Sequence, residues 1–295
     1  MRFLFVDRIL QLSPAQHIRG IKHITGDDPY LCDDGHGRLC FIPSLIGETL
    51  GQLAAWNVMS VHDFRVRPVA GIAASACLFR PAYVGETLLL ESFIDDLDDS
   101  SVRYHSIARI GDEVVFTLND ALGPLLPMED FIDAHEVRLQ LSEINRPGDW
   151  PPVIPSEEQG AILDSPLLPR VSMSFDRILR CDAGVQLWAE KRISRSAPYF
   201  PDHFPKKPVL PMTVLLESKI NLAQEFIKLS GLNADYQVQE LRKIKMKEFV
   251  LPGDILICHL KLKQHEGDTL ILSFSSEVAG KRVCVMEMSL VAKGF

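Results

Sequence analysis

The stretch that decides the fold occurs twice in the chain. It first reads Val6-Asp7-Arg8-Ile9-Leu10, and it returns as Phe175-Asp176-Arg177-Ile178-Leu179, displaced by 169 positions. The same displacement recurs further along the chain, in the pairs Pro29 and Pro198, Tyr30 and Tyr199, Glu48 and Glu217, and Gly111 and Gly280. A constant offset over so much of the sequence indicates an internal duplication.

Each copy shows the same order of expected elements. An apolar helix is expected at 44–61 and again at 212–229, and each should be buried because apolar side chains cover most of its surface. Segments rich in Val, Ile, Leu and Phe follow, and they predict strands at 87–94, 103–110 and 113–118, then at 255–263, 269–278 and 282–292. One buried helix followed by antiparallel strands predicts an α+β fold, with a sheet wrapped around the helix.

The duplication divides the chain into two units and a connection. The units are predicted at 1–125 and 170–295, with the connection at 126–169. Its first part, 128–144, has helical periodicity, whereas the later part is too rich in proline for regular structure. These prolines are Pro147, Pro151, Pro152, Pro155, Pro166 and Pro169. We expect the connection to lie over the surface and to let the two units pair side by side.

The composition excludes several classes of protein. The 295 residues can bury two cores, and a net charge of −8 argues against nucleic acid as the main partner. No apolar run approaches the length that crosses a membrane. The six cysteines are scattered, without a Cys-x-x-Cys pair or a His at metal-ligand spacing, so we expect reduced thiols, no metal and a cytoplasmic protein.

The second copy contains the most specific motif. It reads Tyr199-Phe200-Pro201-Asp202-His203-Phe204-Pro205-Lys206-Lys207-Pro208-Val209-Leu210-Pro211. This stretch resembles the active-site segment of the FabZ-type 3-hydroxyacyl-acyl carrier protein dehydratases, in which a His-Phe-Pro turn leads into a helix with a Glu fourteen residues after the His. His203 and Glu217 have that spacing. The resemblance implies two tandem hot-dog units that form an intramolecular pseudo-dimer.

The chemistry of dehydration explains why such a motif needs these residue types. A neutral His203 suits removal of the α-proton near neutral pH. A carboxyl in an apolar channel has a raised pKa, so it can protonate the leaving hydroxyl. The helix that begins after Pro211 offers the backbone N–H groups of Met212 and Thr213 to an enolate-like oxygen. The family usually has Gly where this chain has Met212, and the larger side chain is expected to narrow the tunnel.

The first copy differs from the second at these positions. Asp34 occupies the slot that matches His203, but Glu48 and Gln52 are both present, four residues apart on one helical face. In the FabZ-type homodimers the His of one subunit works with the Glu of the other. The resemblance therefore implies one working site, with His203 as base, Glu48 as acid and Gln52 supporting the acid, whereas Glu217 is the alternative acid. The opposite site, with Asp34 and Glu217, is expected to be vestigial.

The expected reaction converts a 3-hydroxyacyl chain on acyl carrier protein to the trans-2-enoyl product, without a cofactor. The carrier is expected to dock on a basic patch, which consists of Lys206, Lys207, Lys243, Lys245 and Lys247. A plain solvated strand face is the alternative for the last three lysines. A hot-dog thioesterase and a non-catalytic acyl-binding or scaffold protein are the alternative functions. The sequence does not determine the acyl chain length or whether the chain is carried by acyl carrier protein or by coenzyme A. It also leaves open whether the protein forms a homo-oligomer.

Overall fold

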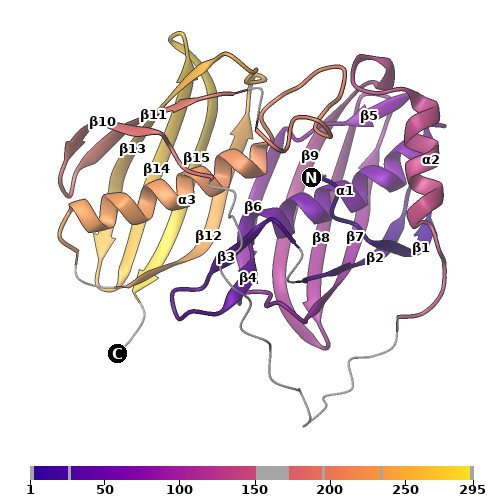
Figure 1. Cartoon of the computed structure of the whole chain (residues 1–295), viewed down its shortest axis with the longest axis horizontal. Helices are drawn as coiled ribbons and strands as arrows, with labels where there is room; N and C mark the ends of the chain where they lie inside the picture. Colours follow the sequence, from indigo (N-terminus) through magenta and orange to yellow (C-terminus); the bar gives the residue numbers. More distant parts are fainter. Residues whose placement is uncertain (1–2, 26–27, 151–172, 195–196, 233–234, 293–295) are drawn as a thin grey trace.

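The computed structural model describes residues 3–25, 28–150, 173–194, 197–232 and 235–292. Within them, a large antiparallel sheet packs against two long helices (Figure 1). The helices are α1 (Pro43–Val61), α2 (Ala134–Ile144) and α3 (Met212–Leu229), with a short 3-10 turn at Met128–Asp130. The strands of the N-terminal half are β1 (Arg8–Ser13), β2 (His17–His23), β3 (Leu31–Asp33), β4 (Leu39–Phe41), β5 (Val66–Pro68), β6 (Ile72–Leu78), β7 (Thr87–Leu97), β8 (Ser101–Ile110) and β9 (Glu113–Pro127). Those of the C-terminal half are β10 (Arg177–Asp182), β11 (Gln186–Arg192), β12 (Tyr236–Met246), β13 (Ile255–Glu266), β14 (Thr269–Val278) and β15 (Lys281–Ala292).

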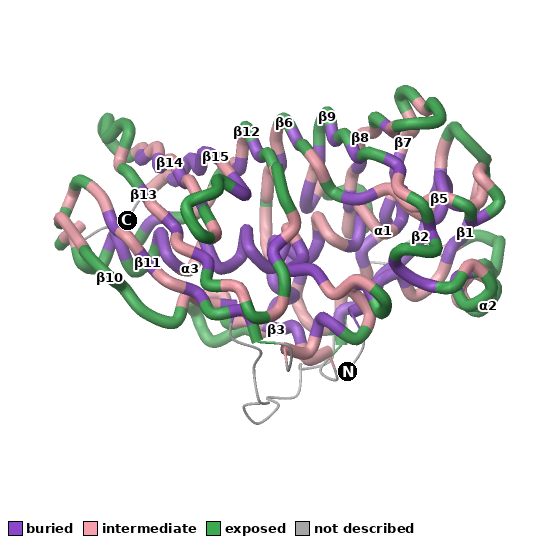
Figure 2. Tube along the Cα trace, turned by 90° about the horizontal axis from the view of Figure 1, so that it is seen from above, coloured by how far each residue is buried: buried purple, intermediate pink, exposed green. Residues whose placement is uncertain are grey.

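The two halves of the chain share one sheet. Its order is β1-β2-β7-β8-β9-β6-β12-β15-β14-β13-β11-β10, so the halves meet where β6 pairs with β12. This junction is antiparallel, with Leu241 opposite Ala76 and Ile244 opposite Ala73. Helices α1 and α3 lie in a row along the inner side of the curved sheet and touch each other (Figures 1 and 2). The molecule therefore has two layers, and its most buried residues lie between them.

The sequence pattern explains this layering. In β14 the side chains alternate between buried and half-buried positions, as in a strand with only one face against a core. Helix α1 begins at Pro43, whose fixed φ suits the first turn of a helix, and its buried set runs nearly all round it. Apolar residues of both halves belong to one continuous core. The predicted α+β fold with a sheet around buried helices is confirmed.

The first residues of the connection between the halves have more regular secondary structure than predicted. Strand β9 continues to Pro127, so residues 126 and 127 belong to the sheet and not to a linker. Helix α2 confirms the helical periodicity for the later part of 128–144, from Ala134 to Ile144, whereas Met128–Asp130 forms a separate 3-10 turn. The chain after α2 runs beside β1, where Asn145 bridges to Ile9. The remaining prolines of the connection lie outside the described residues, namely Pro151, Pro152, Pro155, Pro166 and Pro169.

This connection makes the two edges of the sheet unequal. It leaves Ile9 and Leu10 of β1 at most 5% exposed, whereas the matching Ile178 and Leu179 of β10 are 39% and 48% exposed. Helix α2 stands beside β1 and α1 at the N-terminal end of the sheet (Figure 1). The connection thus covers apolar side chains of the first half and leaves the equivalent ones of the second half open.

Candidate active site

A narrow cavity of about 120 Å³ lies between the helices and the centre of the sheet. Most of its wall is apolar and comes from both halves of the chain, including Val69, Ala73, Ala76, Val102, Phe116, Leu118, Ala121, Leu216, Leu241 and Ile244. The polar side chains of the wall are Ser44, Glu48, Gln52, Arg67, Tyr104, His203 and Thr213. Such a lining suits a ligand with an apolar chain and a polar reactive end.

His203 lies on the loop that precedes α3. Its ring stacks on Phe204 with the centroids 4.2 Å apart, and it meets the edge of Phe3 at 5.9 Å. Nδ1 lies 3.3 Å from the carbonyl oxygen of Val209. Because a carbonyl oxygen only accepts hydrogen bonds, Nδ1 carries the proton in this contact, and Nε2 of the neutral ring keeps a free lone pair.

The surroundings of His203 favour the neutral ring. Burial lowers its pKa below the ordinary value of 6.5. The charge of Glu48 acts in the opposite direction, and the charge of Arg67 lowers the pKa further. Near neutral pH the imidazole is therefore available as a proton acceptor.

Glu48 of α1 is held by residues from both halves of the chain. The amide of Gln52 donates to Oε1 at 3.0 Å, and the hydroxyl of Thr213 donates to Oε2 at 2.8 Å. The same Gln52 side chain donates to the carbonyl oxygen of Phe3 at 3.1 Å and accepts from the backbone N–H of Phe5 at 2.9 Å. Gln52 thus fixes both the carboxyl group and the N-terminal segment that packs against His203.

The first turn of α3 faces the same cavity. Met212 and Thr213 line it. The first N–H groups of a helix have no partner within it, and α3 has no capping side chain that accepts from them. The partial positive charge of the helix N-terminus adds to the effect of these donors. The sequence indicated the backbone N–H of Thr213 but not its hydroxyl, which joins α3 to Glu48.

Arg67 on β5 is a polar residue of the cavity that the sequence did not reveal. Its guanidinium carbon lies 4.0 Å from the centroid of the Phe204 ring. Burial lowers its pKa to about 10, although the charge of Glu48 acts in the opposite direction. A single arginine between Val66 and Pro68 has no periodicity or motif that would have signalled this position.

The two residues predicted for the opposite site also share a cavity, of about 400 Å³. Glu217 of α3 is 6% exposed, and its Oε2 is shielded from solvent without a hydrogen-bond partner. Burial raises its pKa above the ordinary value of 4.5, against a smaller effect of Ser44. The shorter Asn221, which matches Gln52, donates to the carbonyl oxygen of Met173 at 2.9 Å. This carboxyl is therefore far less firmly held than Glu48.

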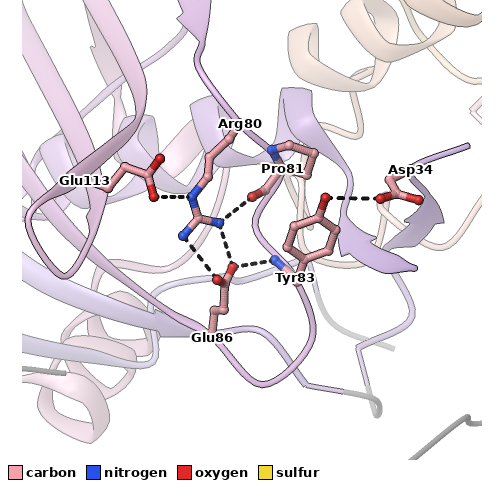
Figure 3. A network of polar contacts seen from close by, with 6 residues as sticks. All are labelled: Asp34, Arg80, Pro81, Tyr83, Glu86 and Glu113. Carbon is pink, nitrogen blue, oxygen red and sulfur yellow. Dashed lines mark hydrogen bonds and ion pairs between the residues drawn. The ribbon is translucent and has the colours of Figure 1, made fainter. Parts of the chain in front are cut away.

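Asp34 lies on the hairpin of β3 and β4. Tyr83 donates to its Oδ2 at 3.0 Å, next to a network in which Arg80 pairs with Glu86 and Glu113 (Figure 3). Burial would raise the pKa of Asp34, but hydrogen bonds from backbone N–H groups and from Tyr83 outweigh it and lower the pKa below 3.8. A carboxylate in this state is a weak base, so the second cavity has no group equivalent to His203.

The lysines of the predicted docking patch lie on two neighbouring parts of the surface. Nζ of Lys207 lies 5.2 Å from the ring centroids of both Phe131 and Phe249. The contact with Phe249 joins the His203 loop to the chain after β12. Lys245 and Lys247 are exposed and Ile244 is buried, but a β-bulge between Arg242 and Lys245 interrupts the predicted alternation. Lys243 pairs with Glu287 at 3.0 Å, so part of its charge is already compensated.

Two features are absent from the described residues. None of the helices in this part of the chain is long and apolar enough to span a membrane. The same residues contain no cluster of three or more His, Cys, Asp or Glu side chains that could hold a metal ion.

Sequence comparison relates this chain to known enzymes. A FabA-like domain model matches residues 168–287, which include His203. The 3-hydroxyacyl-[acyl-carrier-protein] dehydratase FabZ of Thermoanaerobacter sp. (strain X514) is 30% identical over 116 residues, and these cover 39% of this chain and 82% of the relative.

Solved structures share the architecture over nearly the whole chain. The dehydratase domain of the polyketide PpsC from Mycobacterium tuberculosis has a TM-score of 0.57 at 11% identity, with 98% of each chain covered. The 12:0-ACP thioesterase from Umbellularia californica has a TM-score of 0.54 at 12% identity, with 94% of each chain covered. At these identities the likeness shows the hot-dog fold and says nothing of the reaction.

Proposed function

Because this chain belongs to the FabZ-type 3-hydroxyacyl-[acyl-carrier-protein] dehydratase family, we propose that it removes water from a 3-hydroxyacyl thioester on acyl carrier protein. The product is the trans-2-enoyl thioester. The observation that carries the proposal is that His203 and Glu48, from opposite halves of the chain, line one cavity with an apolar wall.

The proposed reaction uses these two groups as base and acid. Nε2 of His203 takes the α-proton, and the electrons of that C–H bond pass into the C1–C2 bond as the thioester carbonyl becomes an enolate. They form the C2–C3 double bond when the C3–O bond breaks. Glu48 gives its proton to the departing hydroxyl, which leaves as water. The proton on His203 then returns to Glu48 and restores the starting state.

The duplication explains why one chain is sufficient. We interpret the halves as two hot-dog units, at 1–125 and 170–295, which pair as a pseudo-dimer through β6 and β12. The first unit supplies Glu48 with Gln52, and the second supplies His203 and the start of α3. In the other cavity, Asp34 takes the place of a base, so we propose a single working site.

The carrier protein is proposed to dock near the His203 loop. Lys206, Lys207 and Lys247 offer positive charge there despite the net charge of −8. A local basic patch can steer an acidic partner while the rest of the surface repels it.

One assay with a 3-hydroxyacyl thioester separates this function from its alternatives. Formation of the enoyl product supports a dehydratase, and release of free thiol supports a thioesterase. If neither product forms, the protein binds the acyl chain without converting it. Glu48→Gln should lower kcat by about 10²–10⁴-fold, because it removes the proton donor. Glu217→Gln is the matched control from the other half. If this second substitution alone abolishes turnover, the proposed pairing of His203 with Glu48 is wrong.

A further inference from the structure

The cavity contains a cation that the proposed reaction does not yet use. Nε of Arg67 is shielded from solvent and has no hydrogen-bond partner among the described residues. Its guanidinium lies over the ring of Phe204, the residue next to the proposed base. A shielded donor without an acceptor is unfavourable for the folded protein. A ligand atom that accepts a hydrogen bond from this Nε would complete the site.

Arg67 stands where two cavities meet. With His203 and Gln52, it lines both the main cavity and a smaller one of about 40 Å³ on the side of α2. The charge of Arg67 acts on His203, and that of Glu48 acts on Arg67, so the three groups lie within electrostatic reach of one another. The guanidinium therefore belongs to the polar, reacting end of the cavity.

The chemistry of the substrate indicates which atom this cation meets. The rest of the main cavity is lined mostly by Ala, Val, Leu and Ile side chains, which suits a neutral acyl tail and not a charged one. In a plain 3-hydroxyacyl thioester, the thioester oxygen gains negative charge when the α-proton leaves. That oxygen lies two bonds from the carbon that loses its proton to His203.

We propose that Arg67 binds the thioester carbonyl oxygen and stabilises the negative charge that develops on it during proton removal. This inference rests on the proposed dehydration. As Nε2 of His203 takes the α-proton, the electrons of the C–H bond move into the C1–C2 bond and those of the carbonyl move onto oxygen. They return when the C3–O bond breaks and Glu48 protonates the departing hydroxyl. The N–H groups of Met212 and Thr213 approach the same oxygen from α3.

The fold holds Arg67 in place before any ligand arrives. On β5 it pairs with Leu126 of β9, and the N–H of Val69 donates to the carbonyl oxygen of Pro124 at 3.1 Å. Gly123 allows this close approach, since a Cβ there would lie 2.6 Å from the oxygen of Val69. A donor held in this way needs little reorganisation during the reaction, which is the condition for electrostatic stabilisation of a transition state.

The test compares three variants with the wild-type protein. Arg67→Gln removes the cation, Arg67→Lys keeps a positive charge, and Arg65→Gln removes the same charge from an exposed side chain two residues away. The substrate is a 3-hydroxydecanoyl thioester of N-acetylcysteamine, which requires no carrier docking. We expect Arg67→Gln to lower kcat about 10²-fold or more with little change in KM. Arg67→Lys should recover part of the rate, and Arg65→Gln should keep all of it.

Two further measurements distinguish this role from a structural one. Removing the cation should move the acid limb of the pH profile to higher pH, because Arg67 lowers the pKa of His203. Thermal unfolding should show that Arg67→Gln remains folded, since the substitution removes a buried charge. If Arg67→Gln keeps the wild-type kcat or changes KM alone, the inference is overturned while the proposed function stands. A wild-type protein that converts no 3-hydroxyacyl thioester overturns both.

Discussion

Replacing Gln52 with Asn tests how the proposed acid is held. This substitution gives α1 the residue type that α3 has at the matching position, Asn221. Gln52 makes three contacts at once, with Glu48 at 3.0 Å, the carbonyl oxygen of Phe3 at 3.1 Å and the N–H of Phe5 at 2.9 Å. An Asn side chain is shorter by one C–C bond, about 1.5 Å, so it cannot keep all three.

The expected magnitude follows from these contacts. A neutral hydrogen bond contributes about 0.5–1.5 kcal/mol net, and one to a charged group contributes about 1.5–3 kcal/mol. Losing one or two of them should lower the free energy of unfolding by about 1–3 kcal/mol, measured as a shift of the urea midpoint at constant m-value. Glu48 would also lose one of its two donors, and we expect kcat to fall about 10-fold to 100-fold because the carboxyl is less well positioned.

A matched substitution in the other half separates stability from activity. Asn221→Ala removes one hydrogen bond, to the carbonyl oxygen of Met173 at 2.9 Å. It should lower the free energy of unfolding by about 1 kcal/mol and leave kcat unchanged. If Gln52→Asn keeps both the wild-type stability and the wild-type kcat, the argument that Gln52 holds Glu48 is refuted.

Three further predictions concern pH and charge. Burial lowers the pKa of His203 below 6.5, and the charge of Arg67 lowers it further, whereas the charge of Glu48 raises it. The plateau of kcat/KM should therefore extend through pH 6.5 and fall only at lower pH. A midpoint above pH 6.5 in the measured profile would contradict this. The pKa of Glu217 is raised above 4.5 in the folded protein, so the folded protein holds this proton more tightly than the unfolded chain does. The resulting contribution to the free energy of unfolding is fully present below pH 4.5 and is lost as the pH rises through the raised pKa. Glu217→Gln should therefore unfold at a higher temperature than the wild type at pH 8, and the difference should shrink toward pH 4.5. A variant that is less stable than the wild type at pH 8 would contradict the description of Oε2 of Glu217 as buried without a partner. Reversing the charges of Lys206 and Lys207 to Glu should weaken turnover of carrier-bound substrate and spare the N-acetylcysteamine thioester, and equal loss on both substrates would exclude a docking role.

Local patterns predicted the two long helices and the strands that end each half, but not the short strands β3–β6, the strands β2, β10 and β11, or the pairing between the halves. Both long helices begin and end within one residue of their predicted bounds, and the strand at 269–278 matches β14. The strands that join the halves, β6 and β12, were not predicted as neighbours. Their pairing depends on contacts between residues 163 to 173 positions apart, and local sequence patterns do not report on contacts of such long range.

The residues of the candidate site divide in the same way, into those that local sequence predicts and those that only packing brings together. The motif around His203 and the helical spacing of Glu48 and Gln52 predicted three of its polar residues. Arg67, Tyr104 and the hydroxyl of Thr213 were not predicted, because these groups come together only when β5, β8 and α3 pack around α1. Sequence periodicity reports on single elements, whereas these contacts come from how the elements are packed together.

The strand pair that joins the halves also bears on how the protein behaves at low concentration. An enzyme whose reacting groups come from two separate chains loses activity when it is diluted below the dissociation constant of its dimer. Here β6 and β12 belong to one polypeptide and meet along a continuous ladder. Turnover per molecule should therefore be independent of dilution, and each synthesised chain carries both partners in a fixed one-to-one ratio.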